Sequence, residues 1–521
     1  MAPIVDIRTH PEVVIQHAPP AYPPLEAAPF HPDQPFPEYQ GPVGAHPNPI
    51  YSAVRKSLAA LGLDRERFGK PDWNPIGDLV KPGARIVVKP NWVLHRNEGR
   101  GGTDELITHA SILRPLVDYA WKARPAQIIV GDAPLQICEF DTLLALGFDR
   151  VAKDLIARGC PLQVKDFRRT VMRRGATRAD VANDLQPMDK FVLVDLGEES
   201  LLEAISADAR KFRVTMYDPR LMWNNHRPGV HKYLVARDIL EADLVINAPK
   251  MKTHKKAGVT LALKNLVGIN GNKEYLPHHR KGAANRGGDN YEKASLPKWF
   301  LEQALDFANM YLLGKPRAYR KFCLLAYKIL FLDRIRGKSM DVEGGWHGND
   351  TIWRTCLDLN RVLLYGDTEG RLQDTPQRAT LHILDGIIGG ENDGPLRPDP
   401  VESGAILASL NPAALDYCAS KFMRLNTDFL SIVNHASDQG AHPLLTATPP
   451  KDFPARAPAP STPPPAGSVL RSDDTERQAT RSKTRAGKSW IPCCESSSEV
   501  HTIGFLTDRR CSNDHCVHRP G

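Results

Sequence analysis

Leu244-Val245-Ile246-Asn247-Ala248-Pro249-Lys250 is the stretch that decides the fold, because a short run typical of a buried strand passes directly into polar residues. The same pattern recurs three times, where strand-like runs end in Lys89-Pro90-Asn91, Gly131-Asp132 and Asp385-Gly386. In open parallel sheets, ligands bind at the carboxyl ends of the strands. The four polar ends are therefore expected to lie along one edge of a sheet and to mark the functional site.

Helices are expected between these strands, and the alternation of strand and helix predicts an α/β fold. Its mainly parallel sheet should carry helices on both faces. The predicted strands are Val13–Gln16, Arg85–Lys89, Gln127–Val130, Leu162–Val164, Phe191–Val194, Leu244–Asn247 and Thr380–Leu384. The predicted helices are Tyr51–Leu61, Ala110–Ala123, Phe140–Ala157, His231–Leu240 and Asn411–Arg424.

Residues 1–445 are predicted to form one α/β domain, with a Pro-rich loop at 19–49 and a helical insertion at about 297–340. Within the insertion, the apolar run Phe322–Leu332 is shorter than the roughly 20 residues that span a bilayer. We interpret it as a core or interface helix, and contact with a membrane surface is the alternative. Residues 446–521 are rich in Pro, Ser and Arg and lack periodicity, so they are predicted to be a disordered tail.

Composition excludes several classes of protein. The net charge is +8, and the tail contributes 11 − 8 = +3 of it, so the long body carries only +5. A charge this dilute does not indicate a nucleic-acid partner. The nine cysteines contain no C-x-x-C pair, so neither a zinc ribbon nor an iron–sulfur cluster is expected. No Walker loop, G-x-S-x-G elbow or H-E-x-x-H motif is present.

The N-terminal sequence has no basic region followed by an apolar stretch, so it does not resemble a signal peptide. With cysteines that form no disulfide framework, this predicts a cytoplasmic protein with no membrane partner.

The segment Lys250–Lys281 carries the strongest chemical signal, because Glu274 is its only acidic residue. A loop after the strand is expected to present Lys252, Thr253 and His254 together. The apolar run that follows must be buried, which leaves Lys264 at its edge, either stretched to solvent or beside an anion. The segment therefore predicts an anion-binding site. A solvated basic face is the alternative.

A second cluster, Asp385-Gly-Ile-Ile-Gly-Gly-Glu391-Asn392-Asp393, offers oxygen ligands on a glycine-rich turn after a strand. Such ligands suit Mg²⁺ or Mn²⁺, although Asp, Asn and Gly also form ordinary turns. Three weaker candidates are the glycine loop Gly99–Asp104 for an oxyanion, His109 as a ligand, base or structural residue, and Gly344–Asp350 as a lid or substrate-contact loop.

The order of these motifs resembles the domain of unknown function 362 family from Val13 to Arg424. The motifs are Lys89-Pro-Asn91, Thr108-His109, Gly131-Asp132, Lys252-Thr-His254, Lys264-Asn265-Leu-Val-Gly268, Lys273, His278 and Asp385 with Asp393-Gly-Pro395. Ala110 departs from the proline that the family commonly has there. The family is sometimes fused to ferredoxin-like modules, whose cysteines this chain lacks. Asp243–Lys273 also has a fainter resemblance to the N-terminal domain of the nickel-pincer lactate racemase family.

The resulting hypothesis is an enzyme that uses a divalent metal (Mg, Mn or Ni) on a small anionic substrate, as an isomerase or in group transfer. His254 and Lys264 are the predicted catalytic residues, and the predicted metal ligands are Asp132, Asp385 and Asp393. The predicted substrate-binding residues are Lys89, Asn91, Lys252, Thr253, Asn265, Lys273 and His278. The alternatives are a non-enzymatic protein that binds RNA or another polyanion, and a redox protein that has lost its cluster module.

Overall fold

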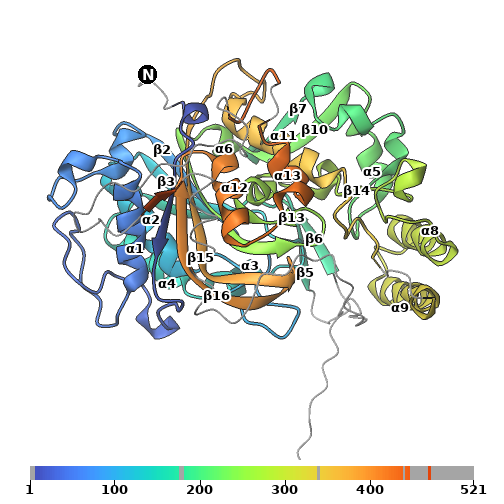
Figure 1. Cartoon of the computed structure of the whole chain (residues 1–521), viewed down its shortest axis with the longest axis horizontal. Helices are drawn as coiled ribbons and strands as arrows, with labels where there is room; N and C mark the ends of the chain where they lie inside the picture. The colour runs from blue at the N-terminus through green and yellow to red at the C-terminus, as the bar shows by residue number, and fades with distance from the viewer. Residues whose placement is uncertain (1–5, 175–180, 337–340, 438–439, 446–467, 471–521) are drawn as a thin grey trace, which may run out of the picture.

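The computed structural model describes residues 6–174, 181–336, 341–437, 440–445 and 468–470, and its centre is a ten-stranded sheet (Figure 1). Five neighbouring strands are parallel, in the order β15 (Ala379–Asp393), β11 (Leu244–Ala248), β2 (Arg85–Pro90), β3 (Gln127–Asp132) and β4 (Leu162–Asp166). The antiparallel strands β16 (Arg397–Ser409), β1 (Val13–His17) and β17 (Ser468–Leu470) continue the sheet beyond β15. The predicted α/β class with a mainly parallel sheet is confirmed.

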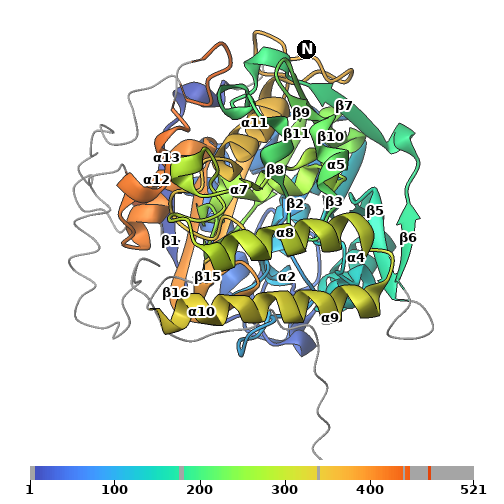
Figure 2. The ribbon, with the colours of Figure 1, turned by 90° about the vertical axis from the view of Figure 1, so that its right-hand side faces the viewer.

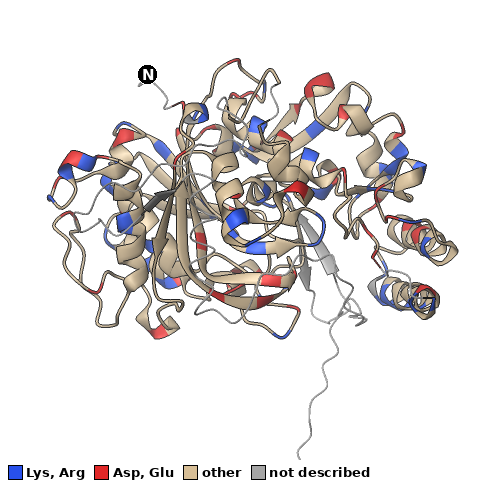
Figure 3. Cartoon of the chain, viewed as in Figure 1, with Lys and Arg blue, Asp and Glu red and all other residues tan. Residues whose placement is uncertain are grey.

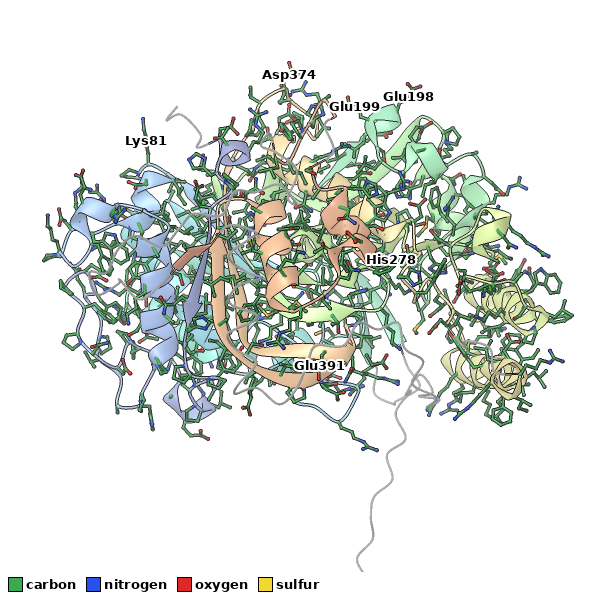
Figure 4. The ribbon with its side chains drawn as sticks, in the orientation of Figure 1. Lys81, Glu198, Glu199, His278, Asp374 and Glu391 are labelled. Atoms are coloured by element: carbon green, nitrogen blue, oxygen red, sulfur yellow. The ribbon has the colours of Figure 1, made fainter. Side chains whose placement is uncertain are left out.

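The direction of the strand order changes between β2 and β11. From β2 the chain builds outward to β3 and β4, whereas from β11 it builds in the other direction to β15. Ligands of open α/β sheets bind at such a switch point, outside the carboxyl ends of the strands. Lys81 and Asp374, which precede β2 and β15, lie at the top of Figure 4, and Glu391, near the end of β15, lies at the bottom. The carboxyl edge therefore faces downward in this view.

Alternate residues of the parallel strands point to opposite faces of the sheet and pack into two separate cores. Helices cover both faces because each core needs them. Ile86, Val88 and Ile246 enter the larger core with α1 (Pro49–Ala60), α2 (Ala110–Lys122) and α4 (Phe148–Ala157). Val87 and Val245 enter a second core on the opposite face. That core contains α6 (Arg237–Leu240), α11 (Ile352–Tyr365) and the antiparallel sheet of β7 (Phe191–Asp195), β10 (Val230–Ala236) and β9 (His226–Arg227).

The predicted insertion is a helical hairpin on the outside of the molecule. Figure 2 shows α8 (Leu296–Tyr311) lying beside α9 (Pro316–Tyr327), which continues into α10 (Phe331–Ile335). In the described part of the chain, no helix combines the length and the apolar character needed to cross a membrane. The shorter elements are α3 (Phe140–Leu144), α5 (Pro219–Trp223), α7 (Leu261–Asn265), α12 (Pro412–Phe422), α13 (Ser431–Asn434), β5 (Thr170–Arg174), β6 (Val181–Leu185), β8 (Phe212–Arg213), β12 (Lys250–His254), β13 (Gly258–Val259) and β14 (His279–Arg280).

Two of the predicted helices are wrong in part. The predicted helix His231–Leu240 is mostly strand β10, which pairs with β7 and buries Tyr233 and Val235, and only its last residues form α6. The aromatic and β-branched residues of this stretch favour a strand. The predicted helix Phe140–Ala157 is divided into α3 and α4 at Gly147, whose φ of 121° no helix accommodates.

Two predicted loops are strands. Residues Lys250–His254 form β12, which pairs with β15 and buries all five residues. Asp385 does not end its strand, because β15 continues to Asp393 in pairing with β16 and changes register between Gly386 and Ile388. The glycines that suggested a turn instead let the strand approach its neighbours closely: a Cβ at Gly386 would lie 2.6 Å from the Met251 side chain.

The predicted disordered tail, 446–521, lies outside the described residues except at 468–470. Those three residues form β17 and pair with β1.

Candidate anion-binding site

The carboxyl end of β3 holds a buried ion pair. Lys89 Nζ, on β2, donates to Asp132 Oδ1 at 2.6 Å, and it also donates to the carbonyl of Pro90 and to Asn265 Oδ1. Asp132 in turn accepts from the backbone N–H groups of Trp92 and Ala133. Every polar atom of this pair has protein partners, so its geometry is that of a structural pair.

Asn265 ties the two sides of the switch point together. Its Oδ1 accepts from Asn91 Nδ2 at 2.8 Å on the β2 side, and its Nδ2 donates to Asn247 Oδ1 at 2.7 Å at the end of β11. Asn91 also receives support through its backbone N–H, which donates to the Thr108 hydroxyl. The sequence-predicted residues Lys89, Asn91 and Asn265 therefore do converge, but their hydrogen bonds join protein groups to one another.

A second buried ion pair lies on β15. Lys250 Nζ is 3.2 Å from Asp385 Oδ2, and both groups bond to the Tyr22 hydroxyl, which comes from the Pro-rich loop. Asp385 also accepts the backbone N–H of His109. The His109 ring stacks on Tyr22 at 4.1 Å and caps α2 through Nδ1, so the structural interpretation of this histidine holds.

The three predicted metal ligands do not gather. Asp132 and Asp385 each contact their own buried lysine, and Asp393 forms an ion pair with Lys255. In the part of the chain that the structure describes, no three His, Cys, Asp or Glu side chains are placed to hold a metal ion.

Lys264 is the exception among these lysines. It lies on α7, whose first backbone N–H groups, of Ala262 and Leu263, donate to Asp416 at 2.7 and 2.9 Å, while Asn360 donates to the carbonyl of Leu263. The helix is thus fixed from α12 and α11. Among the described residues, Lys264 has neither a hydrogen bond nor an ion pair, and burial lowers the pKa of its half-buried amine.

Five other basic groups surround Lys264 and, with it, form what we call the basic cluster: Lys252, His254, Lys256, Lys264, Lys273 and His278. Burial lowers the pKa of His254 well below its usual value, and the charges of Lys264, Lys256, His278 and Lys252 lower it further. Burial and the charges of Lys256 and Lys264 do the same for His278. These mutual effects mean that the six groups share one small region of like charge.

Within the described residues, the other three lysines of the basic cluster donate hydrogen bonds only to neutral oxygens. Lys252 Nζ donates to the carbonyl of Leu106, Lys256 Nζ to the Thr215 hydroxyl at 3.0 Å, and Lys273 Nζ to the Thr215 carbonyl at 3.4 Å. Burial and the charge of Lys256 lower the pKa of Lys273 to about 8. A cluster of ammonium groups without a bonded carboxylate is strained in the free protein, and a bound anion would relieve that strain.

The two histidines of the basic cluster have opposite hydrogen-bonding patterns. His254 Nδ1 accepts from the backbone N–H groups of Lys256 and Ala257, at 3.1 and 3.2 Å, so its neutral ring carries the proton on Nε2. His278 Nδ1 lies 2.7 Å from the carbonyl of Leu276 and must donate to it, which leaves a lone pair on Nε2. One ring therefore offers a donor and the other an acceptor.

Most of this site lies in one segment of the sequence that is similar to a known protein family. Residues 195–421 match the family described as Domain of unknown function (DUF362). The predicted resemblance is confirmed for this segment, which contains the whole basic cluster, whereas β1 to β4 precede it. The resemblance to the lactate racemase family stays a prediction.

Two further proteins are similar to the chain. The thylakoid-associated protein sll1697 of Synechocystis sp. is 21% identical over 353 residues, which cover 67% of this chain and 66% of that protein. The chain therefore spans about two thirds of the length of this relative. The match to a crystal structure of a protein from Thermotoga maritima covers 72% of this chain and 59% of that protein's chain, at 10% identity and a TM-score of 0.29.

The loop before α11 lies against the basic cluster. Asn349 donates to the carbonyl of His278 at 2.9 Å, and the charge of Glu343 acts on Lys256 and Lys273. The predicted lid Gly344–Asp350 thus contacts the site. His278 is labelled in Figure 4, in the part of the molecule between α12 and the α8–α9 hairpin.

Sequence reasoning missed several residues of the site. Tyr22 lies in a proline-rich loop. Asn360 and Asp416 lie on helices, where the sequence pattern does not indicate that a polar residue is buried. Lys256 is adjacent to His254 and was part of the basic segment, so its spacing could have singled it out. The predicted Thr253 instead donates to the carbonyl of Asn392 and joins β12 to β15.

Proposed function

We propose that this protein is an enzyme that binds a small anionic substrate, carrying phosphate or carboxylate, at the basic cluster. The observation that carries the proposal is Lys264, a half-buried ammonium that has no ion pair or hydrogen bond among the described residues. Nearby lysines that are structural, Lys89 and Lys250, each have a buried carboxylate. An anion would complete the same arrangement for Lys264, Lys256 and Lys273.

The two histidines suggest how the bound anion would react. His254 donates from Nε2 to an oxygen of the substrate, and His278 takes up a proton at its free Nε2. Burial and the neighbouring lysines lower the pKa of His278, and the negative charge of a bound substrate would raise that pKa toward neutrality, where a base works best. The reaction class is proton abstraction next to an anionic group, as in an isomerase.

A divalent metal stays a prediction. Asp132, Asp385 and Asp393 each already contact a lysine, so Mg²⁺, Mn²⁺ or Ni²⁺ at this site would be held chiefly by the substrate. The polyanion-binding alternative is less well supported, because in the view of Figure 3 basic and acidic residues alternate around the outline. The cytoplasmic location also stays a prediction, since the relative in Synechocystis is named for an association with thylakoids.

Ligand binding is tested by thermal shift and isothermal titration with inorganic phosphate, sulfate and malonate. We expect the wild type to be stabilised by at least one of them, and Lys264→Met to lose that response. Lys153→Met, on the exposed face of α4, is the control and should respond like the wild type. If Lys264→Met binds as the wild type does, the site is elsewhere.

The reaction is tested separately. A compound that binds is incubated with the protein in D₂O, and exchange of its C–H protons is followed by NMR. His278→Asn should keep the Nδ1-like donor and the binding but lose exchange, because it lacks the acceptor corresponding to Nε2. If none of the bound compounds exchanges protons, the binding site stands and the proposed proton abstraction fails.

A further inference from the structure

The helical hairpin of α8, α9 and α10 carries an apolar surface that no described element covers. Of the nineteen large hydrophobic side chains that are exposed in the described residues, ten lie between Leu296 and Ile335. Figure 2 shows this hairpin at the front of the molecule, with no other labelled element over it. A concentration of this kind marks a binding surface, whereas single exposed apolar residues are ordinary.

On α8 these side chains form one stripe. Leu296, Phe300, Phe307 and Tyr311 are spaced by 4, 7 and 4 residues, which places them on the same side of a helix, and Trp299 adjoins them. The opposite side of α8 is separately packed, because Leu301 and Ala308 are buried. The helix therefore has one apolar face against the protein and a second that faces outward.

The second half of the hairpin extends the surface. Leu325, Leu332 and Ile335 are spaced by 7 and 3 residues and are about half or more exposed, at 68%, 47% and 68%. Phe322 on α9 lies 5.6 Å from Phe307 on α8, between ring centroids, so the two stripes meet across the hairpin.

The acidic residues of the hairpin are buried, whereas most of its basic residues are exposed. Residues 296–336 contain eight Lys or Arg and three Asp or Glu, a balance of 8 − 3 = +5. All three acids are buried: Glu302 accepts from Asn290 and Tyr291, Asp306 pairs with Arg213 and Lys281, and Asp333 accepts from Ser295. The exposed charged residues are all basic: Lys315, Arg317, Lys321, Lys328, Arg334 and Arg336.

We propose that this hairpin docks on the surface of a membrane that contains anionic lipids. Exposed aromatic and aliphatic side chains beside Lys and Arg, without exposed acids, are the pattern of helices that lie in the interface of a bilayer. The apolar stripe enters the boundary between headgroups and acyl chains, and the basic residues contact the phosphates. The proposal departs from the sequence-based expectation that the chain has no membrane partner, and it is independent of the proposed enzymatic function.

The test is flotation of the full chain with vesicles of phosphatidylcholine alone or mixed with phosphatidylglycerol. We expect binding to the mixed vesicles, little binding to the neutral ones, and release by high salt, because the lipid charge is screened. The triple variant Lys315→Gln/Lys321→Gln/Lys328→Gln should bind about 100-fold more weakly, given that each basic residue near the surface contributes about fivefold. Trp299→Ser/Phe300→Ser/Leu325→Ser should lose binding to a similar degree.

Matched controls come from α4. Ile156→Ser removes an aliphatic side chain of similar exposure, 51%, and Lys153→Gln removes a basic one, so both variants should bind like the wild type. Equal binding to both kinds of vesicle, or none to either, overturns the proposal. So does a wild-type dimer in light scattering that the Trp299→Ser/Phe300→Ser/Leu325→Ser variant converts to a monomer, because the face would then bind a second copy.

Discussion

The buried lysines of the strand ends and the lysines of the basic cluster lie close together, yet their surroundings differ. Lys89 and Lys250 end on the carboxylates of Asp132 and Asp385, and further hydrogen bonds complete both pairs. Among the described residues, Lys264 has no such partner, and Lys256 and Lys273 donate hydrogen bonds only to Thr215. The lysines that are paired with carboxylates stabilise the fold, whereas the lysines without a carboxylate are available to bind a ligand.

The comparison predicts the largest effect for Lys89→Met. This variant removes the cation and leaves Asp132 buried without its ion pair, which should lower the free energy of unfolding by about 3–5 kcal/mol. Urea denaturation measures the change. Replacing both partners, as Lys89→Met/Asp132→Leu, should recover part of the loss, and a Lys89→Met protein as stable as the wild type would contradict the structural role.

Lys264→Met should behave in the opposite way. Because no carboxylate is left behind and a partly desolvated charge is removed, the free protein should be as stable as the wild type or up to about 1 kcal/mol more stable. The affinity for the anion should fall about 10- to 100-fold, as for a hydrogen bond to a charged group. Loss of several kcal/mol of stability would place Lys264 with the structural lysines.

The parallel core was predictable because its strands carry continuous apolar runs that end at polar residues, as in Leu244–Asn247. The prediction of helix for His231–Leu240 was wrong because a short apolar run fits either structure, and the choice depends on pairing with β7, distant in sequence. For Asp385–Asp393 the glycines suggested a turn, whereas long-range pairing with β16 keeps the segment in a strand.

The candidate site was predictable as a set of residues but not as a set of roles. The residues that follow the strands do meet, as their positions suggest: Lys89, Asn91, Asn265 and Asp132. Whether such a residue bonds to protein or is free to bind a ligand depends on partners such as Tyr22, which no local sequence pattern predicts. Lys264 could be assigned to two opposite environments from the sequence, and only its neighbours in space distinguish them.

The pH dependence of anion binding sharpens the comparison further. In the folded free protein the pKa of Lys273 is about 8, below the value of about 10.4 for an unfolded lysine. Below pH 8 the charged amine therefore lowers the stability of the fold by its full amount, and this penalty disappears as the pH rises from 8 toward 10.4. A bound anion offsets this penalty only while the amine is charged.

The increase in melting temperature caused by sulfate, whose charge stays constant, should therefore be larger at pH 7 than at pH 9.5. Lys273→Met corrects for the general stabilising effect of sulfate on proteins and should flatten the difference between the two pH values. A sulfate effect that grows with pH would be inconsistent with lysines as the binding groups.

The smallest predicted effect concerns the two histidines of the basic cluster. His254→Asn keeps an oxygen that can accept the backbone N–H groups of Lys256 and Ala257, but it lacks the donor at Nε2. The fold should survive, and the anion should bind about fivefold more weakly, as expected for one hydrogen bond of about 1 kcal/mol. The ¹⁵N chemical shifts of the free protein provide a direct check, with the proton expected on Nε2 of His254 and on Nδ1 of His278. If both rings carried the proton on the same nitrogen, they would present two donors or two acceptors to the ligand, and the roles assigned to the two histidines would have to be abandoned.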